Sequence, residues 1–490
     1  MDKYQLNPDY LLRQDGNRVI LCSKNYLTNN GEDWFTFIHP LQAMMLSFFR
    51  GEKKIDEEIN CCAKFFNLPF VEMCNIIAPF VENDETISIC DRNGHCVLFP
   101  RKILIKANNH PRLDYKASNF YYIENPDYET LRLEYPVYIN MELIMQCYTD
   151  CCYCYANRKA FGSKNFLETE RILDFIQEAY EGGVLQMDIN GGEVLLHPGI
   201  MTILRKLISC HYDPLISTKI PISKEIIDNL CDVGIKRIQI SLDSADVDTL
   251  NVMLHTDKKY LQKMKVTLRL LEQADMITNI NVVLTKFNSS YDEIKKLLDF
   301  VAQYRNVKEV RFNPCGYSLY KDNFLNISLT ENEIQEIEKY IRKISQYYPR
   351  LSINISGHES YYMYSDSYRQ QNYCKRALCT GNVRNAVLLP SGDVTICEEL
   401  YAHPRFILGN IKQSSLKDIW NSKRAIELFH FSQTNKSDSP CHSCSTQKVC
   451  REGKGVCWKT VLMAYGMEKW DYPDPRCPKA PAPHNIFYSE

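Results

Sequence analysis

The sequence predicts an α/β protein in three parts, and three observations support this. From about residue 134, strands and helices alternate through six βα units with short loops, which is typical of a parallel sheet with helices packed outside it. Before these units, short strands are followed by amphipathic helices. After them, cysteines recur from Cys374 to Cys477. The 490 residues are enough for three or four domains of about 100–200 residues each.

The sequence of the first part predicts three strands followed by three helices, which is a winged-helix-like α+β arrangement. The strands are "YLLRQDG", "RVILCS" and "DWFTFIH", with turns at Asp-Gly and "NNGED". Apolar residues at helical spacing mark "HPLQAMMLSFFRG", "IDEEINCCAKFFNLP" and "FVEMCNIIAPFVEND", and Gly51 is expected to stop the first helix. We place this domain at residues 1–88.

The next segment, "SICDRNGHCVLFP", predicts a hairpin that turns at Arg92-Asn93-Gly94. A linker is expected from there to about residue 130. We therefore assign residues 89–130 to a hairpin and linker.

The alternating part is expected to span residues 131–345. Its strands are "PVYINMEL", "VLQMDIN", "PLISTKI", "KRIQISLDS", "INVVLTK" and "VKEVRFNP", each followed by a helical pattern. The last helix is expected at "TENEIQEIEKYIRKISQYYP", with Thr330 as its N-cap. Residues 346–490 form the cysteine-rich part.

Composition excludes several functional classes. The net charge of −2 gives no basic surplus for nucleic acid, and the sequence has no apolar run of about 20 residues that could span a membrane. The polar start "MDKYQLNPDYLLRQDGNR" does not fit a secretory signal, so we expect a cytoplasmic protein. Thiols stay reduced in that compartment. Clustered cysteines among the 21 are therefore expected to bind metal or to be catalytic, rather than to form disulfides.

The tightest cysteine cluster follows the first strand of the alternating part. Cys147, Cys151 and Cys154 have the spacing C-x3-C-x2-C, while Cys152 is out of register and is expected to be a bystander. Three thiolates can hold three irons of a four-iron cluster and leave the fourth open, whereas zinc usually takes four ligands and prefers C-x2-C pairs. Active sites of parallel αβ barrels lie at the C-terminal ends of the strands, where this loop is expected.

With Tyr153 before its last cysteine, this motif resembles that of the radical S-adenosylmethionine enzymes. "NGGE" resembles the family's glycine-glycine-glutamate motif, which meets the amino group of the methionine moiety, and "SLDS" resembles its fourth-strand motif near the ribose. "STK" stands where relatives often have threonine-asparagine-glycine, which is a departure. The resemblance implies a partial (β/α)6 barrel with S-adenosylmethionine at the open iron. It also implies cofactor contacts from Gly191, Gly192, Glu193, Ser217, Ser241 and Asp243.

Alone, each of these pieces has a simpler explanation. A glycine pair after a strand is usually a turn, Asp243 would more often be a helix cap, and His197-Pro198 would more often start a helix. It is their occurrence together with the cysteine motif that favours the enzyme family.

The C-terminal cysteines, in "CKRALC", "GDVTIC", "CHSCSTQKVC", "GVCWK" and "DPRCPKAP", resemble the extended SPASM domain, which carries two auxiliary four-iron clusters. The resemblance implies that one cluster is held by Cys374, Cys379, Cys397 and Cys457, and the other by Cys441, Cys444, Cys450 and Cys477. Two spacings depart from the pattern: the gap from Cys450 to Cys457 is longer than in relatives, and that from Cys374 to Cys379 is one residue shorter than expected. If Cys374 is not a ligand, one iron would be open to a substrate thiolate. A zinc ribbon would fit two C-x2-C pairs better than this spacing.

The N-terminal part resembles the RiPP recognition element, a peptide-binding domain similar to the peptide chaperone of pyrroloquinoline quinone synthesis. "PLQAMMLSFFRG" carries much of this resemblance. It implies that a leader peptide adds as a strand to the sheet edge, here "DWFTFI", and packs on the last helix. A DNA-binding winged helix is the alternative, which the neutral charge disfavours.

Together these resemblances imply a radical S-adenosylmethionine peptide maturase, an oxidoreductase with three [4Fe-4S] clusters. A 5′-deoxyadenosyl radical would take a hydrogen from a precursor peptide, and the auxiliary clusters would accept the surplus electron. A thioether cross-link is the favoured product, with a carbon–carbon or carbon–oxygen bond as the runner-up. The alternatives are a formylglycine-forming sulfatase maturase, which lacks the N-terminal unit, and a non-catalytic peptide-binding iron–sulfur protein. The expected partners are the precursor peptide and a one-electron reductant such as flavodoxin or ferredoxin. No nucleic acid or membrane partner is expected, and no catalytic acid or base is identified.

Overall fold

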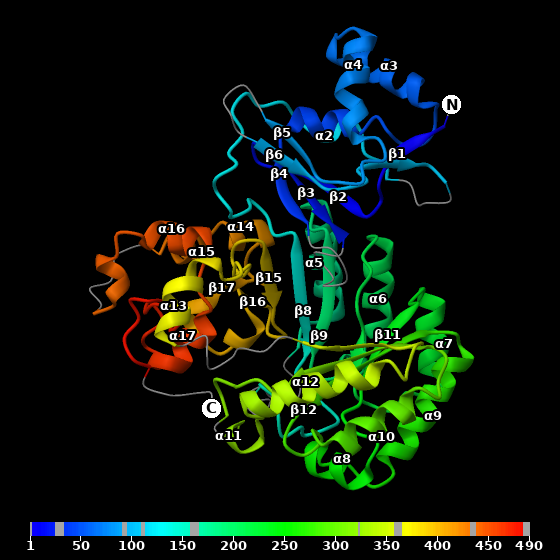
Figure 1. Cartoon of the computed structure of the whole chain (residues 1–490), viewed down its shortest axis with the longest axis vertical. Helices are drawn as coiled ribbons and strands as arrows, with labels where there is room; N and C mark the ends of the chain where they lie inside the picture. The colour runs from blue at the N-terminus through cyan, green and yellow to red at the C-terminus, as the bar shows by residue number, and fades with distance from the viewer. Residues whose placement is uncertain are drawn as a thin grey trace. The chain divides into compact units, whose positions relative to one another are not determined.

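The computed structural model describes residues 2–24, 34–90, 96–108, 113–156, 166–321, 324–356, 365–431 and 438–483. The chain divides into two compact units, Met1–Tyr135 and Pro136–Glu490, and each is described by itself (Figure 1).

The N-terminal unit contains the three predicted strands, which are confirmed as an antiparallel sheet in the order β2-β3-β4. The strands are β2 (Tyr10–Asp15), β3 (Arg18–Ser23) and β4 (Phe35–Ile38). The Asp-Gly turn is confirmed too: Gly16 between β2 and β3 has a φ of +56°, which favours glycine. The turn expected at "NNGED" lies outside the described residues. Two strands were not predicted, β1 (Tyr4–Leu6) and β7 (Leu104–Lys106), which pair with each other.

The three predicted helices of this unit are also present, as α2 (Pro40–Leu46), α3 (Ile55–Phe66) and α4 (Phe70–Ile77), the last extended by the 3-10 turn η1 (Ala78–Phe80). His39 caps α2, and Pro40 takes the first helical position. The prediction that Gly51 stops the first helix was wrong. Helix α2 ends at Leu46, and the turn that follows bends far enough for the Phe49 carbonyl to accept from the Leu6 amide.

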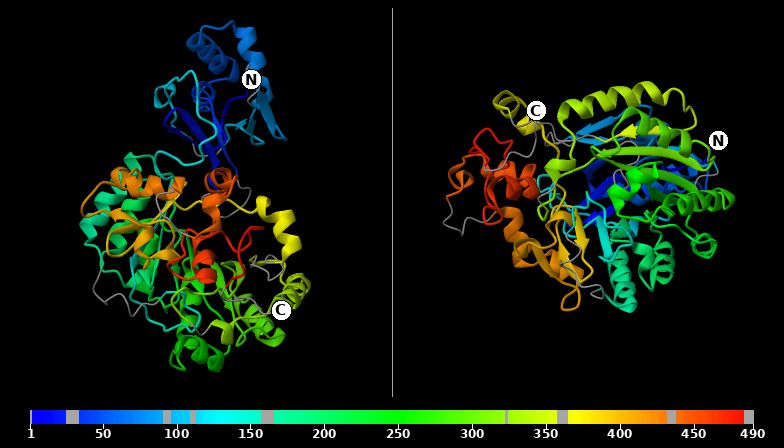
Figure 2. Two further views of the ribbon diagram at one scale, coloured as in Figure 1. Left: turned by 90° about the vertical axis from the view of Figure 1, so that its left-hand side faces the viewer. Right: turned by 90° about the horizontal axis from the view of Figure 1, so that it is seen from below.

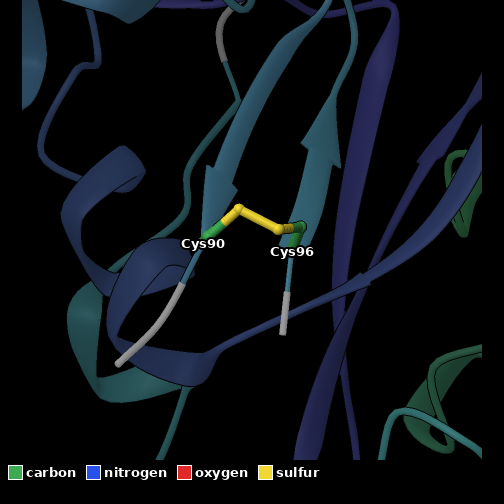
Figure 3. Close-up of a disulfide and its surroundings, with 2 residues drawn as sticks. All are labelled: Cys90 and Cys96. Carbon is green, nitrogen blue, oxygen red and sulfur yellow. A yellow bond between two sulfur atoms is a disulfide. The ribbon is translucent and has the colours of Figure 1, made fainter. Parts of the chain in front are cut away.

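The predicted hairpin is confirmed in strands β5 (Ile87–Cys90) and β6 (Cys96–Phe99). Its expected turn at residues 92–94 lies outside the described residues. The antiparallel register sets Cys90 directly opposite Cys96, and the two form a disulfide (Figure 3). The hairpin and the segment after it are not separate from the N-terminal core, because Phe99, Leu104 and Phe120 pack in it. The 3-10 turn η2 (Ala117–Asn119) lies in the same segment. The domain boundaries at residues 88 and 130 stay predictions.

The second unit contains the six predicted strands of the alternating part, all parallel where they pair. They are β8 (Tyr138–Ile144), β9 (Gln186–Gly191), β10 (Ser217–Thr218), β11 (Arg237–Ser241), β12 (Ile277–Leu284) and β13 (Val307–Pro314). They belong to two five-stranded sheets, β10-β11-β12-β13-β14 and β17-β16-β15-β8-β9. Side chains connect the sheets at β9 and β10, where Asp188 accepts from the Leu215 amide at 3.1 Å and Gln186 donates to the Asp213 carbonyl at 2.9 Å.

Helices cover the outer side of these strands (Figure 1). The predicted ones are α5 (Thr169–Glu181), α6 (Ile200–Ser209), α7 (Lys224–Val233), α9 (Tyr260–Gln273), α10 (Tyr291–Val301) and α12 (Glu331–Ser345). The capping prediction for Thr330 is confirmed, since its side chain accepts from the Glu333 amide in a capping box. Helices α8 (Val247–Leu254) and α11 (Phe324–Ile327) were not predicted.

The C-terminal part continues both sheets. Strand β14 (Ser352–Ile355) pairs with β13, and β15 (Asn385–Leu388) pairs in parallel with β8. Strands β16 (Asp393–Thr395) and β17 (Ile407–Asn410) follow in antiparallel order. The helices here are α13 (Asp366–Asn372), α14 (Leu416–Trp420), α15 (Lys423–His430), α16 (Gln447–Gly453) and α17 (Trp458–Tyr465). In the right-hand view of Figure 2, the orange to red helices of this part lie to one side of the green barrel elements.

Among the described residues, no single helix is long and apolar enough to cross a bilayer. The segments Ile55–Phe66 and Phe70–Phe80 reach that length and composition only as a pair bent by 112°.

Candidate active site

A cavity of about 380 Å³ lies where the barrel strands end. Every strand from β8 to β13 contributes to its wall, through its own last residues or the loop directly after it. Parallel barrels form their active sites at this end.

The three cysteines of the C-x3-C-x2-C motif, Cys147, Cys151 and Cys154, all line the cavity. The Thr149 hydroxyl lies between the first two, at 3.2 Å from the Cys151 sulfur and 3.8 Å from the Cys147 sulfur. Burial raises the pKa of the Cys151 thiol, so metal binding must supply the free energy of its deprotonation.

Cys152 is not among the residues that line the cavity. Its amide donates to the Met253 carbonyl of α8 at 2.9 Å, and burial raises the pKa of its thiol to about 11. This placement supports the prediction that Cys152 is a bystander.

The glycine pair after β9 is a close approach of two backbones. Gly191 has a φ of +127°, and a Cβ there would lie 2.4 Å from the Ile144 carbonyl oxygen. A Cβ on Gly192 would lie 2.2 Å from the Gln146 carbonyl oxygen. Larger residues would therefore push β9 away from the cysteine loop.

Glu193 is buried beside the cavity and held by the end of β10. One carboxylate oxygen accepts from the Thr218 hydroxyl at 2.9 Å, and the other accepts from the Lys219 amide at 3.1 Å. Burial raises the pKa of this carboxyl group, although both hydrogen bonds oppose the rise. The third-strand sequence "STK", which departs from the family pattern, thus orients the glutamate that is expected to meet an ammonium group.

Of three residues predicted to contact the cofactor, Ser217 and Ser241 line the cavity, whereas Asp243 lies behind its wall with a fully buried side chain. Asp243 accepts from the Lys219 ammonium at 2.7 Å and from the Tyr153 hydroxyl at 2.5 Å. Burial disfavours the charge on Lys219, but Asp243 and the nearby thiols outweigh it and raise its pKa. Neither a role for Lys219 nor this network was predicted from the sequence, although the lysine in "STK" was a visible signal.

The C-terminal part also reaches the cavity. Glu399 and Lys459 both line it and form an ion pair at 2.5 Å. Behind them, Glu398 accepts from Asn140 at 3.0 Å, and burial raises its pKa to about 6. Burial also raises the pKa of Glu142 to about 8. None of these residues was predicted, because nothing local in the sequence indicates that the segments meet.

The predicted second group of C-terminal cysteines is brought together by the fold. Burial raises the pKa of the Cys477 thiol, and the nearby thiols of Cys450 and Cys441 add to the effect. Lys479 connects the remaining member, since its ammonium donates to Cys444 at 3.4 Å and its amide to Cys477 at 3.4 Å.

Two arginines also donate to sulfurs of this group. Arg376 donates to Cys450 at 3.1 Å, and Arg451 donates to Cys441 at 3.3 Å. With Lys479, three cations therefore face the sulfurs of the second group. Charge-assisted donors of this kind stabilise thiolates over thiols.

In the first group, three of the four cysteines are near one another. The amide of Cys379 donates to Lys454, and its Cβ faces Gly455 just before Cys457. Burial raises the pKa of the Cys397 thiol, and the thiol of Cys457 adds to it. Cys374, in the 3-10 turn η6 (Tyr373–Lys375), is exposed. Its role as a ligand stays a prediction.

The donor sets fit iron–sulfur clusters by their chemistry. Three thiols on one cavity wall leave room for a further ligand, and the sulfurs of the second C-terminal group already accept hydrogen bonds from cations. Among the described residues, no three His, Cys, Asp or Glu side chains already surround a common point as a preformed metal site would.

Comparison with known sequences supports the same assignment. A model of the Radical SAM superfamily matches residues 141–301, and one of the SPASM iron–sulfur cluster-binding domain matches residues 379–445. The PqqA peptide cyclase of Granulibacter bethesdensis is 24% identical over 356 residues, which are 72% of this chain and 90% of that protein. The PqqA peptide cyclase of Methylocella silvestris is 22% identical over 315 residues, 64% of this chain and 81% of that protein.

Among solved structures, SuiB of Streptococcus suis bound to S-adenosylmethionine has a TM-score of 0.64 at 16% identity, covering 96% of this chain and 99% of that one. SuiB bound to its precursor peptide SuiA has a TM-score of 0.63 at 15% identity, covering 97% and 99%. At these identities the likeness shows a shared fold: an N-terminal β-rich domain, a radical SAM barrel and a C-terminal iron–sulfur domain. From the two sequence matches and the cysteine-lined cavity at the strand ends, the chain is a radical S-adenosylmethionine enzyme with a C-terminal SPASM domain.

Proposed function

We propose that this enzyme cross-links a ribosomally made precursor peptide. The observation that carries the proposal is the separate unit Met1–Tyr135 ahead of the barrel, a compact domain with its own core. Chemistry at the barrel does not require such a domain, whereas a long peptide substrate can use it as a second binding site. The sequence similarity to PqqA peptide cyclases and the fold shared with SuiB, which was solved with a precursor peptide, support the same function.

The N-terminal unit has two features that fit an extended peptide. Strand β4 is an end strand of its sheet, and end strands present backbone donors and acceptors that a peptide strand can pair with. Helices α3 and α4 also expose apolar side chains, with Phe65 at 53%, Phe70 at 40% and Val71 at 70% exposure. We infer that the leader of the precursor binds to this unit.

In the barrel, Cys147, Cys151 and Cys154 would hold a four-iron cluster. With S-adenosylmethionine bound to it, this cluster would supply the radical chemistry that removes a hydrogen atom from the peptide. The chain's own residues would position the cofactor: Glu193 would meet its ammonium group, and the glycine pair would let the backbone come close. Two further clusters, in the C-terminal cysteine groups, bring the proposed total to three.

The favoured bond is a thioether between a cysteine sulfur and a carbon of the peptide. The substrate loses two hydrogens: one leaves as a hydrogen atom, and the other leaves as a proton and an electron. The auxiliary clusters would accept this electron, and an external one-electron donor such as flavodoxin or ferredoxin would supply the electron for cofactor cleavage. A carbon–carbon or carbon–oxygen bond has the same hydrogen balance.

The experiment combines the reconstituted, oxygen-free enzyme with a reductant, S-adenosylmethionine and the short peptides encoded beside its gene. We expect one peptide to lose the mass of two hydrogens while 5′-deoxyadenosine forms. Alkylation with iodoacetamide distinguishes the bonds, because a thioether leaves one cysteine unalkylated. If no neighbouring peptide changes mass while 5′-deoxyadenosine forms, the proposed function is wrong.

A second measurement tests the role of the N-terminal unit. Val71→Glu places a charge on the exposed face of α4 and should weaken binding of the leader by about tenfold or more, since a charge in an apolar contact is costly. The matched control is Val266→Glu, at an exposed residue of helix α9 in the barrel, which should leave the affinity for the leader unchanged. Equal affinities for all three proteins would contradict leader binding at this face.

A further inference from the structure

We infer that Lys219 binds the carboxylate of the methionine moiety of S-adenosylmethionine. The inference depends on the cofactor of the enzyme and not on the peptide that it modifies. Lys219 is the last residue of the third-strand sequence "STK", at the position where relatives often have glycine. The inference gives a role to the ammonium group that replaces this glycine.

Lys219 and Glu193 occupy the same part of the cavity wall. Both line the cavity, and the Lys219 amide donates to the Glu193 carboxylate at 3.1 Å. The methionine moiety carries an ammonium and a carboxylate on a single carbon. A wall that presents one carboxylate and one ammonium side by side matches both charges of this moiety.

The ion pair of Lys219 is arranged so that its positive end faces the cavity. Its partner Asp243 has a fully buried side chain and is fixed from behind by the Val283 amide at 2.9 Å. The Lys219 side chain is 15% exposed, and contacts with Asp243 and Tyr153 use two of the three donors of its ammonium. Asp243 therefore orients the lysine, and the lysine is the charged group within reach of a ligand.

Among the described residues that line the cavity, the other cation is Lys459, and its surroundings differ. Its ion-pair partner Glu399 also lines the cavity, so both ends of that pair face the ligand space. A carboxylate that approaches Lys459 would meet Glu399 as well. Lys219 is therefore the better site for an anion.

The test compares S-adenosylmethionine with its decarboxylated analogue, which keeps the sulfonium and the amine. Dissociation constants are measured by equilibrium dialysis on reconstituted, oxygen-free protein. Lys219→Met should weaken the binding of S-adenosylmethionine by about 10- to 100-fold, as expected for the loss of a hydrogen bond between charged groups. The same substitution should change the affinity for the analogue by less than about threefold. Comparing the two ligands in the wild type and in the variant forms a double-mutant cycle, in which the free energies of the carboxylate's contacts with other residues cancel.

The matched control is Lys459→Met, which should keep the full difference between the two ligands. Lys219→Met leaves Asp243 without its counter-ion, so Lys219→Met/Asp243→Asn, which removes both charges, is measured as a second background. Iron content equal to that of the wild type confirms that each variant is intact.

Two results would overturn the inference. In one, both ligands weaken equally in Lys219→Met and in the double variant, which would show a structural role only. In the other, Lys459→Met removes the difference and Lys219→Met does not. A failure of the proposed function gives a different result. If the dissociation constants change as expected but the enzyme modifies no peptide, the proposed function is wrong and the assignment of Lys219 still stands.

Discussion

The barrel and the C-terminal part both gather cysteines, but they surround them differently. Cys147, Cys151 and Cys154 are close in sequence and lie on an open cavity whose other walls carry Glu193 and Lys219. The C-terminal cysteines come from segments about 100 residues apart, and cations donate directly to three sulfurs of the second group. The first arrangement leaves room for a ligand, while the cations of the second would neutralise the charge of a cluster bound there. The difference fits the proposal that the barrel site does the chemistry and that the second C-terminal group transfers electrons.

The largest expected effect is the loss of the barrel site alone. Replacing Cys147, Cys151 and Cys154 by alanine should abolish 5′-deoxyadenosine formation. The reconstituted protein should fall from about twelve irons to about eight, since four-iron clusters in the C-terminal part would remain. Iron analysis and product chromatography measure both. Cofactor cleavage that survives the triple substitution would place the reactive site elsewhere.

The second prediction concerns closure of the first C-terminal group. If Cys374 is a ligand, Cys374→Ala should disturb the electron paramagnetic resonance spectrum of one auxiliary cluster and lower peptide modification. Cys379→Ala is the positive control, because Cys379 lies beside the Lys454–Cys457 segment. An unchanged spectrum and unchanged activity for Cys374→Ala would refute closure and favour coordination of the substrate's sulfur at an open iron.

A smaller effect is expected from the cations of the second group. Arg376→Met removes a donor and a positive charge from the Cys450 sulfur, which disfavours the more negative reduced cluster and should lower its reduction potential. Lys479→Met should shift the potential in the same direction but less, since Lys479 is exposed. A redox titration followed by spectroscopy measures both. An upward shift for either variant would contradict this account.

The smallest effect is expected at Cys152. Cys152→Ser should leave the iron content and the rate of cofactor cleavage within about twofold of the wild type, because its thiol lies off the cavity wall. If Cys152→Ser lost as much iron as Cys151→Ser, the result would show that all four thiols of the loop contribute to cluster binding.

A feature could be predicted from the sequence when its signal lay within one short segment, and was missed when it depended on distant segments. The C-x3-C-x2-C loop and the glycine pair are short motifs next to strands, so both were found with their places on the cavity. The network of Tyr153, Lys219 and Asp243 was missed, because it depends on three loops that converge only in the fold. Glu399 and Lys459 had no local signal at all.

Other omissions have simpler physical reasons. Strands β1 and β7 are three residues long, too short for a period of two to show. Helix α8 had a usable signal in Asp246, whose side chain caps it. The Cys90–Cys96 disulfide was also within reach, since both residues are equally distant from the expected hairpin turn, so antiparallel register sets them opposite each other.

The parallel pairing of β8 with β15 has a consequence for how the chain folds during synthesis. Residues that lie opposite each other in these two strands, such as Tyr138 and Asn385, are about 250 residues apart in the sequence. At 5–20 residues per second, the ribosome needs roughly 10–50 s to make that stretch. Throughout that time one side of an apolar strand waits without its neighbour, and such edges promote aggregation. A chain cut before residue 385 would keep that edge permanently, so the barrel is not expected to be soluble without the part that follows it.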